Sequence, residues 1–305
     1  MASRGIHHLT TIIGDAPGAA QFYSGILGLR RVKKTVCYDD PGSYHIYFGD
    51  MAGSPGTIIS TLAWECVSQG MTGVGEVVQT AFRVHAGSLD RWAERLNQSK
   101  VVFRRGLSPS GDAMLCFADP EGTSLALVES KLDHCVRVAA ISELSVCGLH
   151  EVTLSVRAAD ATVDIVQDVL GFECVSNEQG LMRFVAHGGP GGSLALRTVG
   201  RSSRGRLGGG TIRHVAFRAA NLDDRSEMVE RLRSTYGIAV SDPIERTYLN
   251  AVGFRAPCGV LFEIATDGPG FAVDEPKEQL GEALQLPEFL EERRPELQAI
   301  LPHLS

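Results

Sequence analysis

Short apolar stretches of alternating polarity, each bounded by turn-forming residues, recur along most of the chain. In the first set, Phe22 and Ile26 fall at helical spacing, and Gly28 is placed to end that helix. Runs rich in Asp, Pro and Gly separate the stretches that follow, which favours strands joined by tight turns. The first set therefore predicts the order β-α-β-β-β, with strands at 7–13, 30–36, 44–49 and 57–64 and a helix at 17–27.

The other three sets resemble the first. The second set predicts a helix at 89–96 and strands at 77–84, 100–104, 113–118 and 124–129. The third opens with a strand at 151–156 and a helix at 162–170. The fourth predicts a helix at 222–235 and strands at 212–219, 248–256 and 260–265. After Asp267 the pattern stops, and we expect a tail that wraps the surface and carries a short helix near 288–301.

The four sets predict how the chain is organised. Its 305 residues are enough for two ordinary domains. We expect four small αβ modules, at about 5–65, 76–130, 148–199 and 208–267. They group into an N-terminal half at 1–135 and a C-terminal half at 147–305, joined by a linker at 136–146 and ending in a tail at 268–305.

The opening strands of the modules align on Ile6-His7-His8 and Ile212-Arg213-His214, with altered copies between them. The third column of this alignment reads His8, Gln79, Glu151 and His214. The spacing is too long for solenoid repeats. Because only the first and last modules have histidine in this column, we expect the chemistry to join the two ends of the chain.

A carboxylate stands inside an otherwise apolar strand of the fourth module, at Glu263. An unpaired buried carboxylate is costly, so it needs a metal, a hydrogen-bonding partner or a cation such as Arg246 or Arg255. The equivalent positions in the other modules are Ser60, Ala126 and Ala195, which cannot supply a strong ligand.

His8, His214 and Glu263 thus form a complete candidate metal-ligand set. A single strand histidine is more often a structural residue, but these residues occur together at equivalent module positions. Two imidazoles and one carboxylate suit Fe(II) enzymes that activate O₂, while Mn(II), Ni(II) or Zn(II) would accept the same ligands.

Composition restricts the class of protein. The net charge of −7 does not indicate the positively charged surface that binds nucleic acid. No apolar run reaches the ~18 residues that span a bilayer, so no membrane partner is expected. Scattered cysteines, odd in number, argue against a disulfide framework and favour a reducing, cytoplasmic location. A homo-oligomer is compatible with the sequence.

Longer phrases carry a resemblance to a known family. The sequence is similar throughout to the vicinal oxygen chelate superfamily, which includes glyoxalase I, bleomycin-resistance proteins and extradiol dioxygenases. It most resembles the ring-cleaving branch of the para-hydroquinone 1,2-dioxygenase type. The matching phrases include Gly5-Ile-His-His-Leu-Thr10, Val32-Lys-Lys-Thr-Val36, Asp39-Asp-Pro-Gly-Ser-Tyr-His45, Tyr47-Phe-Gly-Asp50 and Gly259-Val-Leu-Phe-Glu-Ile-Ala-Thr-Asp267.

The resemblance implies an α+β fold of four βαβββ modules that form two open barrels, with modules one and four paired and modules two and three paired. It places the iron ligands on His8, His214 and Glu263, a pocket residue on Thr10 and a substrate-side arginine on Arg246. The alternative readings are ordinary strand packing for Thr10 and a surface salt bridge for Arg246.

Three stretches depart from the family pattern, one of them Val36-Cys37-Tyr38, where relatives commonly read Val-Asn-Phe-Asp-Asp. Arg213 replaces a second histidine that acts around the substrate in relatives, and we expect its guanidinium to act there instead. Gly253 stands where relatives tend to have a tyrosine. These changes would remove an acid/base group, or they would fit a larger or anionic substrate.

The function implied is that of an Fe(II)-dependent, extradiol-type ring-cleaving dioxygenase. Its partners would be a small hydroquinone- or catechol-like aromatic substrate and O₂, both atoms of which enter the product. The alternatives are a metal-dependent isomerase or lyase of glyoxalase type and a non-catalytic binder of aromatic compounds.

Overall fold

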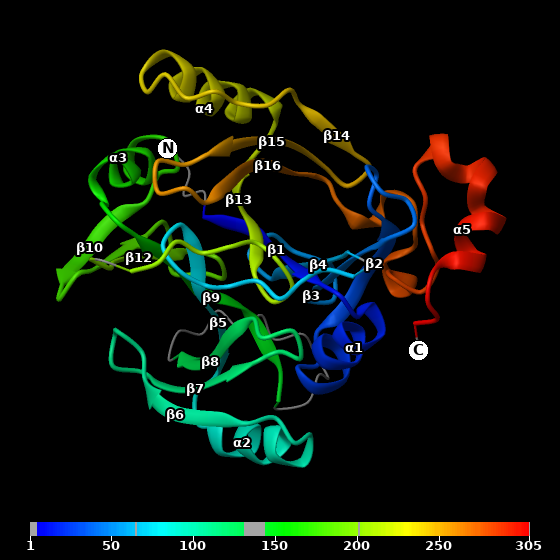
Figure 1. Cartoon of the computed structure of the whole chain (residues 1–305), viewed down its shortest axis with the longest axis horizontal. Coiled ribbons are helices and arrows are strands. Elements are labelled where there is room, and N and C mark those ends of the chain that lie inside the picture. Colours follow the sequence, from blue (N-terminus) through cyan, green and yellow to red (C-terminus); the bar gives the residue numbers. More distant parts are fainter. Residues whose placement is uncertain (1–4, 65, 131–143, 201, 305) are drawn as a thin grey trace.

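The computed structural model describes residues 5–64, 66–130, 144–200 and 202–304. Its body consists of two eight-stranded sheets with few helices (Figure 1). The first sheet contains, in order, β14 (Ile244–Arg246), β15 (Leu249–Arg255), β16 (Leu261–Pro269), β13 (Ile212–Ala219), β1 (Ile6–Ile13), β4 (Ile58–Ala63), β3 (Tyr44–Gly49) and β2 (Arg30–Val36). The second contains β10 (Glu173–Glu178), β11 (Leu181–Val185), β12 (Ser193–Thr198), β9 (Val146–Val156), β5 (Glu76–His85), β8 (Ser124–Ser130), β7 (Ala113–Ala118) and β6 (Phe103–Leu107).

This strand order confirms the predicted α+β fold and the predicted pairing of modules. β1 of the first module pairs antiparallel with β13 of the fourth, and each runs parallel to the last strand of its own module, β4 or β16. The second sheet repeats the arrangement around the antiparallel pair of β5 and β9. The two ends of the chain therefore meet in one sheet.

The helices also follow the module pattern. The first module has α1 (Ala16–Ala20), which continues as the π-helix η1 (Gln21–Ile26), and the later modules have α2 (Leu89–Gln98), α3 (Asp160–Asp168) and α4 (Leu222–Ser234). The Asp15 side chain accepts the backbone N–H of Gly18 and so caps α1. The tail carries η2 (Phe271–Val273), η3 (Lys277–Gln279), η4 (Glu288–Arg293) and α5 (Arg294–Ile300). No helix in the described ranges is long and apolar enough to cross a membrane.

Several expectations need correction. The strand predicted at 100–104 lies at 103–107, because Lys100 adopts a positive φ of 58° and its N–H closes a turn onto Asn97 after α2. The short strand β14 was not predicted. Cys147 is disulfide-bonded, which the scattered spacing did not suggest. Most of the linker expected at 136–146 lies outside the described residues, and β9 already begins at Val146.

Alternate residues of the central strands face different surroundings, as strand geometry requires. Leu9, Val215 and Phe262 belong to the main apolar core. The neighbouring positions His8, His214 and Glu263 project from the other face of the same strands, which we call the inner face of the first sheet. The apolar residues thus fix the strands, and the polar residues between them are held in register.

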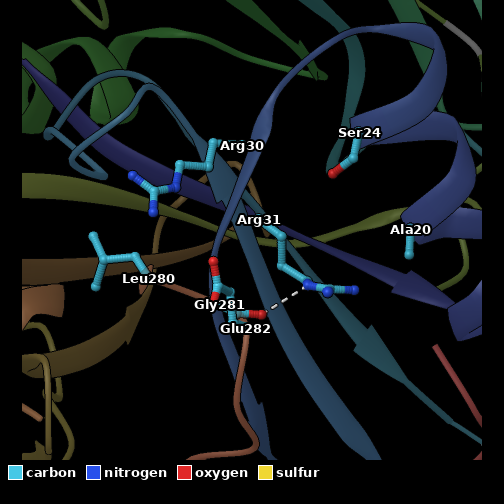
Figure 2. A pocket seen from close by; sticks show the side chains of 7 residues that line it. All are labelled: Ala20, Ser24, Arg30, Arg31, Leu280, Gly281 and Glu282. Atoms are coloured by element: carbon cyan, nitrogen blue, oxygen red, sulfur yellow. Dashed lines mark hydrogen bonds between the residues drawn. The ribbon is translucent and has the colours of Figure 1, made fainter. Parts of the chain in front are cut away.

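The tail packs along the outer edge of the first sheet, against β2. The backbone N–H of Gln285 donates to the Lys34 carbonyl at 2.9 Å, and Arg31 Nε donates to the Gly281 carbonyl at 2.9 Å. A hollow of ≈ 270 Å³ lies beside this contact. Figure 2 shows the side chains that line it, from α1, η1, β2 and the tail. Arg30 also donates to backbone carbonyls, those of Met51 and Glu278. Both guanidinium groups at this hollow therefore hold chain segments together.

Glu76, at the start of β5, carries a carboxylate whose burial raises its pKa to about 7. A folded-state pKa above the unfolded value means that folding binds a proton, so stability is lost as pH rises from about 4.5 to about 7. We expect Glu76→Gln to raise the free energy of unfolding at pH 8 by about 1–2 kcal/mol after allowance for solvent screening. Urea unfolding at pH 8 and pH 4.5 measures this, with Glu94→Gln on the exposed side of α2 as control. An equal gain at both pH values would contradict it.

Candidate metal centre

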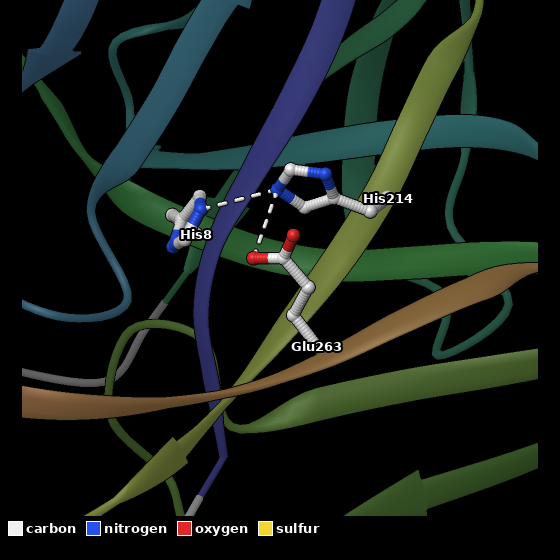
Figure 3. A group of neighbouring side chains, drawn as sticks. All are labelled: His8, His214 and Glu263. Atoms are coloured by element: carbon white, nitrogen blue, oxygen red, sulfur yellow. Dashed lines mark hydrogen bonds and ion pairs between the residues drawn. The ribbon is translucent and has the colours of Figure 1, made fainter. Parts of the chain in front are cut away.

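The strand register of the first sheet brings three potential ligands to one place on the inner face. His8 on β1 lies opposite Ala216 on β13, and Glu263 on β16 pairs with that same Ala216. His214 lies two residues before Ala216, so its side chain projects from the same face. Figure 3 shows the three side chains pointing toward one another from three neighbouring strands. We call His8, His214 and Glu263 the ligand cluster.

The atoms of the ligand cluster lie close enough to share one ion. His214 Nε2 is 3.3 Å from His8 Nε2 and 3.5 Å from Glu263 Oε2. One donor atom from each of the three residues lies within 4.8 Å of the other two, and all three residues are buried. Two imidazoles and a carboxylate on one side of the ion leave other coordination positions open, which fits a divalent transition metal.

Electrostatics favours the metal-binding form of both histidines. Burial lowers the pKa of His214 to about 4, although the nearby Glu263 carboxylate acts in the opposite direction. Burial and the neighbouring imidazole of His7 hold the pKa of His8 well below its usual range. Both rings are therefore neutral near pH 7 and keep a lone pair free for a metal. The Glu263 carboxylate contacts the neutral His214 imidazole at 3.5 Å, and among the described residues it forms no salt bridge with Arg246 or Arg255.

The β1–β13 register slips at two points, which leaves His7 and Arg213 without partners in the pairing. His7 Nδ1 lies 3.0 Å from His8 Nδ1, so the His8 ring contacts another imidazole behind its ligand nitrogen. The Arg213 guanidinium lies over the Trp64 ring, 5.4 Å from its centroid. Arg213, predicted to be catalytic, is thus held against an aromatic ring beside the cluster rather than within it.

Thr10, the predicted pocket residue, lies directly at the cluster. Its Oγ1 is 2.8 Å from His214 Nε2 and 2.8 Å from Ser60 Oγ. The register explains this, because Thr10 pairs with His214 on one side and with Ser60 on the other. Its hydroxyl therefore faces the position of any ion held by His214.

Arg246, the other predicted site residue, lies on β14 at the edge of the sheet. Its guanidinium acts on the Tyr47 hydroxyl of β3, and its charge acts on the pKa of His8, His45 and Tyr47. Its Nε is buried without a hydrogen-bond partner in the described structure. The guanidinium therefore reaches the inner face and keeps one donor free, which does not fit the alternative of a surface salt bridge.

Three residues near the cluster were missed as site residues, and all are buried. His45 and Tyr47 lie two apart on β3, and Ser60 on β4 pairs with Tyr47. A signal was present, because polar residues at alternate positions of an otherwise apolar strand mark a polar inner face. Ser60 was considered only as a missing ligand, not as a hydrogen-bonding group.

The equivalent positions of the second sheet are occupied by polar groups that satisfy one another. Glu151 accepts a hydrogen bond from Arg183 at 2.8 Å, and the Gln79 amide lies 3.8 Å from Cys116 Sγ. Among the described residues, only the first sheet gathers three His, Cys, Asp or Glu donors at such distances. Metal chemistry is therefore expected in one half of a duplicated architecture.

Comparison with known proteins agrees with this architecture. MhqO of Bacillus subtilis (strain 168), named as a candidate ring-cleaving dioxygenase, is 37% identical over 302 residues, covering 98% of this chain and 96% of the relative. A crystal structure of a candidate dioxygenase from Bacillus subtilis subsp. subtilis str. 168 superposes with a TM-score of 0.93 at 36% identity, covering 100% of this chain and 98% of the other. Chlorohydroquinone/hydroquinone 1,2-dioxygenase of Sphingobium indicum is 28% identical, covering 96% of this chain and 94% of the relative.

The family model described as "Glyoxalase/Bleomycin resistance protein/Dioxygenase superfamily" matches residues 5–127 and 148–264, which include all three members of the ligand cluster. These matched segments hold every strand of both sheets except the last residues of β8 and β16 and the first residues of β9. The chain therefore belongs to the glyoxalase/bleomycin resistance protein/dioxygenase superfamily.

Proposed function

We propose that the protein is an Fe(II)-dependent dioxygenase that cleaves a carbon–carbon bond of a hydroquinone- or catechol-like substrate with O₂. The observation that carries the proposal is the buried convergence of His8, His214 and Glu263 on the inner face of the first sheet. The names of its relatives, a candidate ring-cleaving dioxygenase and a hydroquinone 1,2-dioxygenase, support the reaction class. Cleavage would be of the extradiol type, beside a hydroxylated carbon, with both oxygen atoms entering the product.

The ligand cluster would hold the metal. Bound Fe(II) would supply a Lewis-acidic, redox-active centre for the aromatic substrate and O₂. Mn(II) would accept the same donor set, so we include it in the test below. No other carboxylate in the described ranges joins the cluster as a fourth protein ligand. This favours a centre with open positions over the glyoxalase-type site, which uses a second carboxylate.

The surroundings of the cluster suit a planar, oxygen-bearing substrate. On the fourth-module side, small side chains line the inner face next to Glu263, namely Ala216, Ala251 and Ala265. Gly253 pairs directly with Glu263, and a Cβ added there would have no atom closer than 3.8 Å. On the other side, Thr10 of the first module and the free Nε of Arg246 on β14 offer hydrogen-bond donors. A ring would lie against the small residues with its oxygens toward the polar side.

The test measures oxygen consumption by protein of known metal content. Chain purified without oxygen is loaded with Fe(II), Mn(II) or Zn(II), and O₂ uptake is recorded with hydroquinone, chlorohydroquinone and catechol. We expect uptake with the Fe(II) form, ring-opened product, and both atoms of ¹⁸O₂ in that product. Zn(II) protein is the control, since it fills the site without redox chemistry. Protein that holds one iron per chain yet consumes no O₂ with any substrate would refute the proposal.

A further inference from the structure

We propose that a continuous chain of hydrogen bonds, directed from an arginine to the metal centre, holds the Thr10 hydroxyl as a donor to an anionic oxygen bound there. Its members, in order, are Arg246, Tyr47, His45, Ser60 and Thr10, which we call the donor chain. The inference rests on the proposed function, because the anionic oxygen is that of the ionised substrate or of reduced O₂. It assigns positioning roles to Tyr47, His45 and Ser60.

The members of the donor chain lie next to one another. The Arg246 guanidinium acts on the Tyr47 hydroxyl, which lies 3.3 Å from His45 Nδ1. His45 Nε2 lies 3.1 Å from Ser60 Oγ, and Ser60 Oγ lies 2.8 Å from Thr10 Oγ1. Thr10 Oγ1 then reaches His214 Nε2 at 2.8 Å. Strand pairing sets these contacts, because Tyr47, Ser60 and Thr10 lie in one row across β3, β4 and β1.

The direction of the donor chain follows from its first member. A guanidinium is a positively charged group with donors only, so its charge turns the lone pairs of the Tyr47 oxygen toward Arg246 and the hydroxyl hydrogen away from it. The Tyr47 hydrogen then has His45 Nδ1 as its recorded acceptor. Burial keeps the pKa of His45 well below its usual range, so this ring is neutral and carries its proton on Nε2. That Nε2–H donates to Ser60, and the Ser60 hydroxyl is left to donate to Thr10.

Thr10 is therefore the end of the donor chain, with its own hydrogen directed at the cluster. With this direction His214 Nε2, 2.8 Å away, is the acceptor of the Thr10 hydrogen, and a metal bound to that nitrogen would free the hydrogen for an oxygen beside the ion. If the hydrogen bonds of the donor chain ran in the opposite direction, the Tyr47 hydroxyl could not donate to His45 Nδ1. Buried polar groups rarely remain unpaired, and here Tyr47, His45, Ser60 and Thr10 are each no more than 4% exposed.

The consequence is a fixed donor at the point where negative charge develops. Pre-oriented donors in a site shielded from water stabilise such charge strongly, because they need no reorganisation during the reaction. Hydrogen bonds in a chain also polarise one another, so the positive end at Arg246 strengthens the last donor. The module equivalents of Tyr47 are Cys116, Arg183 and Gly253, which pair with Ala126, Ala195 and Glu263 on the adjoining strands. The hydroxyl and imidazole members of the donor chain thus belong to the first module, on the side of the cluster opposite Gly253, and β14 of the fourth module supplies the arginine.

The test interrupts the donor chain at residues that do not bind the metal. In Ser60→Ala, Thr10 keeps its hydroxyl but loses the group that orients it, and Ser60→Thr restores a hydroxyl. Thr61→Ala changes the neighbouring residue, which projects from the other face of β4, and serves as the matched control. The probe is 4-nitrocatechol bound to Zn(II)-loaded protein, whose absorbance reports the ionisation of the bound catechol without turnover.

We expect Ser60→Ala and Tyr47→Phe to bind one Zn(II) per chain, as wild type does, and to bind ionised 4-nitrocatechol about 10-fold more weakly. The pH at which the bound probe ionises should rise by about one unit, which is the same tenfold factor. Thr10→Val should lose more, on the order of 100-fold, since it removes the donor itself. Ser60→Thr and Thr61→Ala should behave as wild type.

Two outcomes separate this inference from the proposed function. If wild type holds its metal but does not bind 4-nitrocatechol, the proposed substrate class is wrong, and the donor chain has no oxygen to serve. If wild type binds the probe in ionised form, and Ser60→Ala and Tyr47→Phe ionise it at the wild-type pH, the donor chain is refuted and the proposed function stands.

Discussion

Replacing His214 with alanine is expected to abolish both stoichiometric Fe(II) binding and O₂-dependent turnover. His214 Nε2 is the atom that lies closest to both other members of the ligand cluster, at 3.3 Å from His8 and 3.5 Å from Glu263. Without it, one imidazole and one carboxylate remain. Loss of a residue that hydrogen-bonds a metal ligand typically weakens metal binding by about 10–100-fold. Loss of the ligand itself should therefore weaken Fe(II) binding by more than about 100-fold. Metal analysis after anaerobic dialysis, with O₂ uptake on the same samples, measures both effects.

His150→Ala is the matched control for this experiment. His150 lies on β9, the strand of the second sheet equivalent to β1 and β13, and burial lowers its pKa to about 4. The substitution removes a half-buried strand imidazole and leaves the cluster intact. We expect it to keep one iron per chain. If His214→Ala retains Fe(II) at wild-type affinity, or if His150→Ala loses it equally, the ligand assignment is wrong.

The fold and the meeting of the three candidate ligands could be predicted because both depend on periodic patterns. Each module repeats the same alternation, so His8 and His214 occupy equivalent positions of strands that pair across a pseudo-twofold. Glu263 stands out as a charge in an apolar strand, and its register with Ala216 follows from the parallel pairing within a module. The structure brings these residues together as predicted, and metal binding itself remains a prediction.

The surroundings of the cluster could not be predicted in the same way. The donor chain depends on the register between β3 and β4 and on a contact between the edge strand β14 and β3, neither of which periodicity fixes. Arg213 lies in a slip of the β1–β13 register, so simple alternation does not give its direction. A bulge places an extra residue on one strand and redirects the side chains around it.

The tail is the second feature that sequence patterns did not resolve. It was expected to wrap the surface, and it does lie along β2, but its anchor is buried. Lys33 is fully buried on β2, with its Nζ 2.5 Å from Asp274 Oδ1 and in contact with Glu275. The same ammonium lies 4.6 Å from the centre of the Tyr248 ring, and the Tyr248 hydroxyl donates to Asp274. A lysine in a strand gives no sign of partners about 240 residues away.

Lys33→Met is accordingly expected to destabilise the protein by about 3–5 kcal/mol. The substitution keeps the length and apolar stem of the side chain but leaves the buried Glu275 carboxylate without its cation. Removing one partner of a buried ion pair typically costs this much, because the remaining charge stays uncompensated. Urea unfolding at pH 7 measures the loss. Hydrogen exchange should show the largest loss of protection at Gly281 and Ala283, whose N–H groups donate to Glu275.

Two further variants decide whether the charge or the packing of Lys33 matters. Lys34→Met changes the next residue on β2, whose side chain is half-buried, and should alter stability by no more than about 0.5 kcal/mol. The double variant Lys33→Met with Glu275→Gln removes both charges and should recover part of the loss, because burying a neutral amide costs less than burying an unpaired carboxylate. If the double variant is as unstable as Lys33→Met, packing rather than charge holds the tail. If Lys33→Met unfolds at the same urea concentration as wild type, the tail does not depend on this ion pair.

The tail also reaches the donor chain, because Tyr248, which contacts Lys33, packs against Tyr47 with ring centres 6.4 Å apart. A loosened tail should therefore also weaken the binding of 4-nitrocatechol.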